Sequence, residues 1–324
     1  MKTITLEEHY VSPSFLEGPG KGLKEQAKNP ESYIGRLFGQ LCDLGEKRIA
    51  EMDAAGIDVQ VLSLNSPGVE QLEAEEARKI AKETNDFLGN AVKTHPRRFA
   101  GFATLPTADP KAAAIELERT VREYHFKGAI INGHVIGRYL DDKFFWPILE
   151  QAEALEVPIY LHPTQPPQAV IDASYSGFDP MVTNMLIGAG WGWHIETAVH
   201  VIRLMLGGVF DQYPKLQIII GHLGETLPFM LERMDRIMNM ETTKLKRPIS
   251  AYLRENIHYT FSGFNYTSVF LNLLLEVGVD RIMFSVDYPY ASMAQGRDFL
   301  NKLPVSAADK ERIAHGNAES LLRM

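Results

Sequence analysis

The stretch Thr3-Ile4-Thr5-Leu6-Glu7-Glu8-His9-Tyr10 begins as an apolar strand and ends in side chains that can bind a metal ion. Successive side chains of a strand point to opposite faces, so Glu7 and His9 point the same way and Glu8 points elsewhere. A carboxylate and an imidazole together suit a divalent cation. An exposed strand end can carry the same pair without binding a metal. The rest of the chain decides between these interpretations.

The composition is that of an ordinary folded protein. The chain has 324 residues, 45% of them hydrophobic and 23% charged, with a net charge of -8 and a single cysteine, Cys42. The acidic balance argues against nucleic acid or an anionic membrane as the main partner, and one cysteine excludes an intrachain disulfide framework or a cysteine-based metal cluster. No basic leader and no apolar run of about 18 residues occurs, so we expect a cytoplasmic protein with a small-molecule partner.

Apolar strand candidates alternate with helical segments along the whole chain. The eight strand candidates are residues 3–10, 59–64, 99–103, 128–132, 157–162, 216–222, 257–262 and 281–287. Such alternation predicts a parallel sheet with helices outside, and eight units close into an α/β fold of the (β/α)8 TIM barrel type, here as one domain over residues 1–324. An open doubly wound sheet is the alternative, but no Gly-x-Gly-x-x-Gly motif follows any strand.

Two long segments interrupt the alternation. Residues 11–47 are rich in Gly, Pro, Lys and Glu, and residues 163–193 are rich in Pro, Gly and aromatic side chains. Unstructured segments of this length are uncommon in compact domains unless they have a function. We therefore expect insertions after the first and fifth strands, the second of them overhanging a pocket.

Polar side chains end most of the predicted strands, where a barrel of this kind has its active site. These are Glu7, His9, Asn132, His162, His222, Ser262 and Asp287. Taken singly, a histidine often only packs in a core, and an aspartate often starts a turn. Glu7, His9, His162 and Asp287 can together surround one cation, so we predict one divalent metal ion. Mn²⁺ and Zn²⁺ suit these ligands, and the two histidines disfavour Mg²⁺.

Glu225 follows His222 by three residues at the start of a predicted helix. A carboxylate there can bind the imidazole, fix its tautomer and raise its basicity. A carboxylate also stabilises a helix N-terminus by itself. Both roles are compatible, and we expect His222 and Glu225 to act behind the metal ligands.

Several segments together resemble the metal-dependent decarboxylases of the amidohydrolase superfamily. The resemblance covers almost the whole chain and rests on residues 5–10, 65–69, 161–163, 196–200, 221–225 and 284–289. It is closest to γ-resorcylate and 2,3-dihydroxybenzoate decarboxylases, which also have Glu-x-His on the first strand, where hydrolytic relatives and aminocarboxymuconate-semialdehyde decarboxylase have His-x-His. The resemblance implies that Glu7, His9, His162 and Asp287 hold the metal, that His222 lies near the substrate and that Asn132 lies on the pocket wall.

Two departures from that family concern the substrate pocket. The family often has Trp after the final Asp and Phe two positions further on, whereas this chain has Tyr288 and Tyr290, so we expect extra hydroxyls around the substrate ring. The segment after Asn132, residues 133–137, is also shorter than in the resorcylate enzymes. Arg233 either pairs with a substrate carboxylate or makes an exterior ion pair.

The resemblance implies nonoxidative decarboxylation of a hydroxybenzoate, with release of CO₂ and a phenol. Asp287 is the candidate acid, because a carboxyl group beside a substrate anion and aromatic walls can carry a proton near neutral pH. His222, held by Glu225, would bind the phenolic oxygen or relay the proton. The alternatives are a metal-dependent hydrolase that opens a lactone or amide and a barrel without catalytic activity. The segment 11–47 and the resemblance also predict a homodimer or homotetramer.

Overall fold

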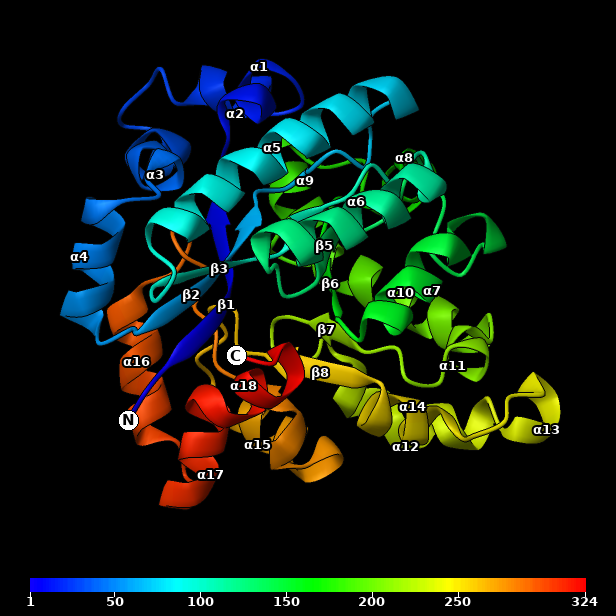
Figure 1. Ribbon diagram of the computed structural model, residues 1–324. Helices are drawn as coiled ribbons and strands as arrows, with labels where there is room; N and C mark the ends of the chain where they lie inside the picture. The colour runs from blue at the N-terminus through cyan, green and yellow to red at the C-terminus, as the bar shows by residue number, and fades with distance from the viewer.

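The strands of the computed structural model, which describes residues 1–324, form one parallel barrel (Figure 1). They are β1 (Ile4–Tyr10), β2 (Val59–Leu64), β3 (Phe99–Gly101), β4 (Ala103–Thr104), β5 (Ala129–Asn132), β6 (Ile159–His162), β7 (Ile218–Ile220), β8 (Ile257–Thr260) and β9 (Ile282–Met283). Every neighbouring pair within the two sheets, β1–β3 and β4–β9, is parallel. A parallel bridge between Leu6 and Ser285 joins the last strand to the first. The predicted TIM barrel is therefore confirmed.

The third predicted strand is interrupted at Phe102, which separates β3 from β4. The backbone N–H of Phe102 still donates to Leu62 O at 2.9 Å, so the interruption keeps contact with β2. The Phe102 side chain is fully buried with Tyr160 and Ile219 inside the barrel. The interruption thus divides the barrel into two sheets without opening it.

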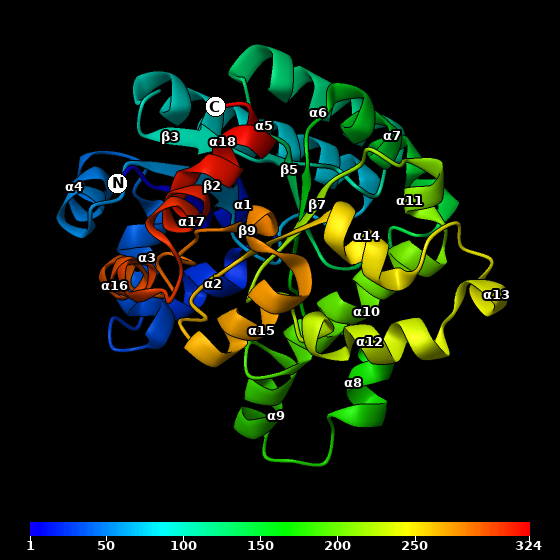
Figure 2. The ribbon, with the colours of Figure 1, turned by 90° about the horizontal axis from the view of Figure 1, so that it is seen from below.

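Helices cover the outside of the barrel (Figures 1 and 2). The main ones are α4 (Glu46–Ala55), α5 (Ala74–Thr94), α6 (Pro110–Tyr124), α7 (Trp146–Leu155), α10 (Gly192–Leu206), α12 (Leu227–Ile237), α15 (Thr267–Val277) and α16 (Met293–Lys302). Shorter elements are α11 (Val209–Gln212), α13 (Met240–Thr243), α14 (Ile249–Glu255), α17 (Ala307–Glu311), α18 (Asn317–Leu322), η1 (Lys143–Phe145), η2 (Val279–Arg281) and η3 (Arg312–Gly316). No helix is both long enough and apolar enough to cross a membrane.

The sequence explains where the long helices begin and end. Pro110 stands in the first turn of α6, and Asp109 caps that helix by accepting a hydrogen bond from Ala112 N at 3.2 Å. Gly56 ends α4 with φ 72°, a left-handed conformation that glycine adopts without steric cost. Helix α5 buries the apolar stripe Ala77, Ile80, Ala81 and Leu88 against the barrel.

The two long segments contain short helices and meet over the carboxyl ends of the strands. Between β1 and α4 lie α1 (Pro13–Glu17), α2 (Lys21–Gln26) and α3 (Tyr33–Cys42), and between β6 and α10 lie α8 (Gln168–Ser174) and α9 (Pro180–Ile187). Figure 2 shows α8 and α9 projecting at the edge of the molecule. Residues from both segments line the same cavity.

Candidate metal centre and active site

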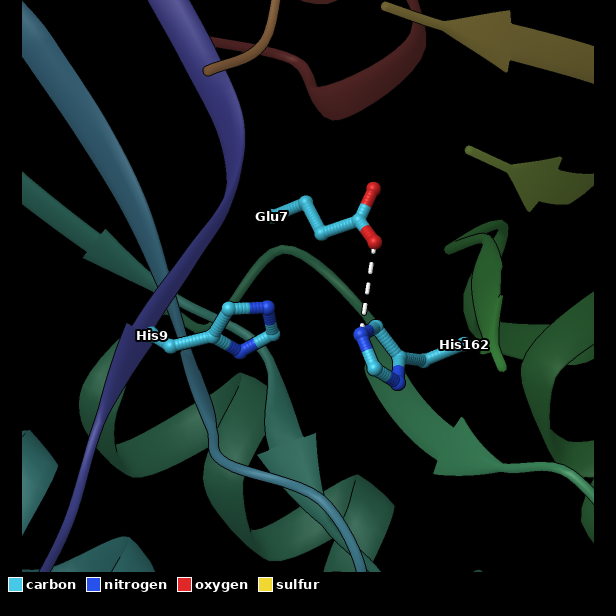
Figure 3. A group of neighbouring side chains, drawn as sticks. All are labelled: Glu7, His9 and His162. Carbon is cyan, nitrogen blue, oxygen red and sulfur yellow. Dashed lines mark ion pairs between the residues drawn. The ribbon is translucent and has the colours of Figure 1, made fainter. Parts of the chain in front are cut away.

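Glu7, His9 and His162 meet at the carboxyl ends of β1 and β6 (Figure 3). One ligand atom from each lies within 4.8 Å of the other two, and all three residues are buried. The pairing of β1 with β2 shifts register between Thr5 and Glu8, and Glu7 has φ 66°. This bulge lies where Glu7 enters the cluster, and bulges commonly re-aim a side chain in this way.

The hydrogen bonding of His162 leaves its second ring nitrogen available to a cation on the side of Glu7. Nδ1 of His162 donates to Pro163 O at 2.7 Å, and burial, followed by the neighbouring histidines, holds the pKa of His162 well below its ordinary value. The Nε2 lone pair therefore faces Glu7 Oε1 at 3.3 Å, and when Glu7 is ionised both atoms are acceptors. Glu7 Oε1 and His9 Nδ1 are buried without any hydrogen-bond partner. The cluster therefore fits a divalent cation.

The other carboxylate oxygen of Glu7 is held by hydroxyl groups below the cluster. Tyr160 and Ser262 both donate to Glu7 Oε2. Thr260 Oγ1 lies 2.6 Å from the Tyr160 hydroxyl and 2.9 Å from Ser262 Oγ, which completes a buried polar network. These bonds fix the Glu7 carboxylate with Oε1 turned to His162, in the way that outer contacts orient metal ligands.

Asp287, the fourth predicted ligand, lies beside the three-residue cluster and contacts it through His9. Its Oδ1 lies 3.1 Å from His9 Nε2, and its side chain is 21% exposed to the cavity. Glu8, which the strand alternation turns away from the cluster, accepts hydrogen bonds from Val286 N at 2.9 Å and Tyr288 N at 3.3 Å. These two amides flank Asp287, so Glu8 fixes the backbone that presents it. Burial raises the pKa of Glu8 to about 8.

His222 lies on the other side of Glu7 and is bound by Glu225. His222 Nδ1 is 2.7 Å from Glu225 Oε1, and His222 Nε2 is 3.9 Å from Glu7 Oε1. Burial alone would lower the pKa of His222, but the carboxylates of Glu225 and Glu7 raise it to about 10. A cation bound at Glu7 would offset part of that effect. Helix α12 begins at Leu227 rather than at the predicted Glu225, because residues 222–226 form a turn in which both His222 and Glu225 have φ 52°.

A cavity of about 860 Å³ opens above these residues. His9, His162, His222 and Asp287 face it from the barrel, and no lysine or arginine lines it. The aromatic walls come from the two long segments and from later strand ends, and they include Tyr33, Trp193, Phe264, Tyr266 and Tyr290. The Tyr290 hydroxyl donates to Asn65 Oδ1 at 2.6 Å. The cavity therefore suits a planar aromatic molecule whose negative charge is met at the cluster.

The sequence pattern of the family described as "Amidohydrolase" matches residues 40–324. The chain belongs to the amidohydrolase family. It is 38% identical to a gamma-resorcylate decarboxylase from Polaromonas sp. (strain JS666), over 99% of this chain and 98% of that protein. The predicted resemblance to decarboxylases of this superfamily is thereby confirmed.

Two crystal structures are similar to this amidohydrolase over the whole chain. A 2,6-dihydroxybenzoate decarboxylase complexed with 2,6-dihydroxybenzoate has a TM-score of 0.89 and 36% identity, with 100% of both chains covered. A 5-carboxyvanillate decarboxylase from Novosphingobium aromaticivorans, complexed with manganese and 4-hydroxy-3-methoxy-5-nitrobenzoic acid, has a TM-score of 0.91 and 35% identity, with 100% of this chain and 96% of that chain covered.

Three residues predicted to bind substrate lie outside the lining of the cavity. Asn132 is buried behind the cavity, with its backbone N–H donating to Glu70 Oε1 at 2.9 Å. The Tyr288 hydroxyl donates to Glu51 Oε2 at 2.9 Å, and its ring packs under the Arg48 guanidinium. Arg233 is exposed on α12. None of the three lines the cavity of this amidohydrolase, whereas Tyr290 does.

Three residues of the site were absent from the sequence-based prediction. Tyr160 lies two residues before His162 on β6, so the alternation rule that selected Glu7 with His9 would have found it. Trp193 and His194 reach the cavity from the start of α10. They follow an irregular segment, and no periodic pattern indicates where such residues point.

Proposed function

We propose that this amidohydrolase is a carboxy-lyase that removes CO₂ from a hydroxybenzoate without oxidation and releases a phenol. The observation that carries the proposal is the pair of acceptors, Glu7 Oε1 and His162 Nε2, which face each other at 3.3 Å beneath a cavity with aromatic walls. The chain is similar over its full length to gamma-resorcylate decarboxylases, which supports a substrate of the dihydroxybenzoate type.

Glu7, His9, His162 and Asp287 are the residues proposed to hold one divalent ion, Mn²⁺ or Zn²⁺. When bound, this ion would neutralise the substrate carboxylate and its ortho oxygen. Manganese is present in the 5-carboxyvanillate decarboxylase structure, which supports Mn²⁺ as the first metal to test. Two histidines among four ligands make Mg²⁺ the weaker candidate.

The proton that replaces CO₂ is proposed to come from Asp287. This carboxyl group faces the cavity from the turn after β9, and Glu8 fixes the amides on both sides of it. The proton bonds to the ring carbon that bears the carboxylate, which interrupts the aromaticity of the ring. The bond from that carbon to the carboxylate then breaks, its electron pair returns to the ring and restores aromaticity, and neutral CO₂ leaves. Asp287 regains a proton from solvent.

His222 is proposed to bind the phenolic oxygen through Nε2. Glu225 occupies Nδ1, so Nε2 is the ring atom directed at Glu7 and the cavity. The ring of Tyr290 stands 5.7 Å from that of His9, centroid to centroid, and supplies an aromatic wall beside the cluster. Together these contacts would orient the ring carbon toward Asp287.

Isotope labelling tests the reaction class. Turnover of 2,6-dihydroxybenzoate in D₂O should place one deuterium at the former carboxylate carbon and release CO₂. Turnover in H₂¹⁸O should leave the phenolic product free of ¹⁸O. A metal-dependent hydrolase would give the opposite pattern, since water oxygen enters its product. A substrate screen that yields only ¹⁸O-labelled products would refute the proposal.

A homodimer or homotetramer is proposed as the working state. Helix α9 carries large apolar side chains that are mostly exposed in one chain, among them Met181 at 67% and Met185 at 65%. Exposed apolar patches of this kind commonly mark contacts between proteins. Light scattering at micromolar concentration tests this proposal. A monomer at that concentration would show that the segment containing α9 serves only the cavity.

A further inference from the structure

Glu225 is shared by two imidazoles rather than one. Its Oε1 lies 2.7 Å from His222 Nδ1, and its Oε2 lies 2.6 Å from His194 Nδ1. The three residues are buried, and the two rings stand 4.6 Å apart, centroid to centroid, at 67°. The carboxylate therefore connects the turn after β7 to the first turn of α10.

Both ring nitrogens of His194 face atoms that only accept hydrogen bonds. Nδ1 faces Glu225 Oε2, and Nε2 lies 3.0 Å from Ala189 O. Burial alone would raise the pKa of Glu225, but His222 and His194 hold that pKa below its ordinary value, so the carboxylate is ionised. Hydrogen bonds to both acceptors need a proton on each nitrogen. This inventory makes His194 an imidazolium.

A positive charge on His194 is balanced by the buried carboxylate of Glu225. No lysine or arginine lines the cavity, and Glu225 is a buried carboxylate whose two oxygens face only these two rings. The positive charge of His194 offsets the negative charge of Glu225, and Glu225 remains bound to Nδ1 of His222 through its other oxygen. His194 also ties the end of the segment after β6, at Ala189, to the active-site turn.

We propose that His194 is a positioning residue: doubly protonated, it holds Glu225 against Nδ1 of His222, so that Nε2 of His222 faces the metal cluster and the cavity. The kinetic consequence rests on the proposed decarboxylation, whereas the protonation of His194 and the contact of Glu225 with Nδ1 of His222 do not. An outer contact of this kind typically contributes about tenfold to a hundredfold to activity.

Three variants of the metal-loaded enzyme test the kinetic part. His194→Leu removes the contact to Glu225, and we expect kcat for 2,6-dihydroxybenzoate to fall about tenfold to a hundredfold, with KM changed less than about threefold. His194→Asn places a side-chain amide near the former Nδ1 and should restore most of kcat. His315→Leu is the matched control, because His315 also bridges two acceptors, Glu319 and Glu311, but lies outside the cavity. It should match the wild type.

Imidazole ¹⁵N NMR tests the structural part without any turnover. A doubly protonated ring gives two similar nitrogen shifts, and a neutral ring gives two widely separated ones. At neutral pH we expect the first pattern for His194 and a proton on Nδ1 of His222, where Glu225 accepts it. In the His194→Leu variant the nitrogen shifts of His222 should change, because Glu225 is no longer held against Nδ1. A neutral His194 ring, or unchanged kcat and His222 shifts in His194→Leu, would overturn the proposal even if the enzyme proves to be a hydrolase.

Discussion

Nε2 of His9 lies 3.1 Å from Oδ1 of Asp287, so the two ends of the barrel sheet meet in the active site. His9 stands at the end of β1, and Asp287 follows β9. The bridge between Leu6 and Ser285 joins β1 to the chain just after β9. Closure of the barrel and assembly of the site therefore depend on the same contact region.

Asp287→Asn should lower kcat at least about a hundredfold, because the amide keeps the shape of the side chain but cannot deliver a carboxyl proton. Metal content measured by plasma mass spectrometry separates a lost proton donor from a lost ligand. A variant that keeps both its metal and wild-type turnover would show that another group protonates the ring.

Glu7→Gln should weaken metal binding about tenfold to a hundredfold, since a neutral amide replaces the only carboxylate that faces His162. Competition with a chelator measures the affinity. Glu70→Gln is the matched control, because Glu70 is an equally buried carboxylate that binds Asn132 and Val69 amides outside the cluster. Equal chelator sensitivity of the two variants would argue against the proposed site.

Stability should fall as pH rises through the titration of Glu70. Burial raises the pKa of Glu70 from 4.5 to about 7 in the folded protein. The folded state therefore binds the extra proton, and the stability this contributes is complete below about pH 4.5 and lost as pH rises through about 7. The difference between the two pKa values of Glu70 corresponds to ~3 kcal/mol of unfolding free energy. The free energy of unfolding, measured with urea at about pH 5 and pH 8, should decrease less between the two pH values in Glu70→Gln than in the wild type. An equal decrease in both proteins would contradict the assignment to Glu70.

Tyr290→Phe should raise KM about fivefold, the equivalent of ~1 kcal/mol, because the ring loses the hydroxyl that anchors it to Asn65 at the cavity wall. Tyr288→Phe is its control. It loses the contact to Glu51 outside the cavity, so unfolding free energy should fall by about 1 kcal/mol with kcat and KM unchanged. The reverse pattern would place Tyr288, and not Tyr290, beside the substrate.

The sequence predicted the strands and the residues at their ends well, because the alternation of side chains is a local property. Glu7 with His9, and the opposite orientation of Glu8, followed from that rule, and Tyr160 would have followed from it too. Tyr288 and Tyr290 lie beyond β9, where the chain no longer has a strand period, so their orientations had to come from the tertiary structure. His194 depends on a contact 31 residues away, which no local pattern specifies.

The cavity draws its charged floor from the strand ends and part of its aromatic rim from two segments elsewhere in the chain. The proposed metal ligands stand on barrel strands or shortly after them, whereas Tyr33 and Trp193 come from the segments that follow β1 and β6. Exchange of either rim segment between relatives would therefore alter the choice of ring substituent while the reacting groups stay in register. For protein engineering, such an exchange would test whether selectivity and reactivity can be varied separately.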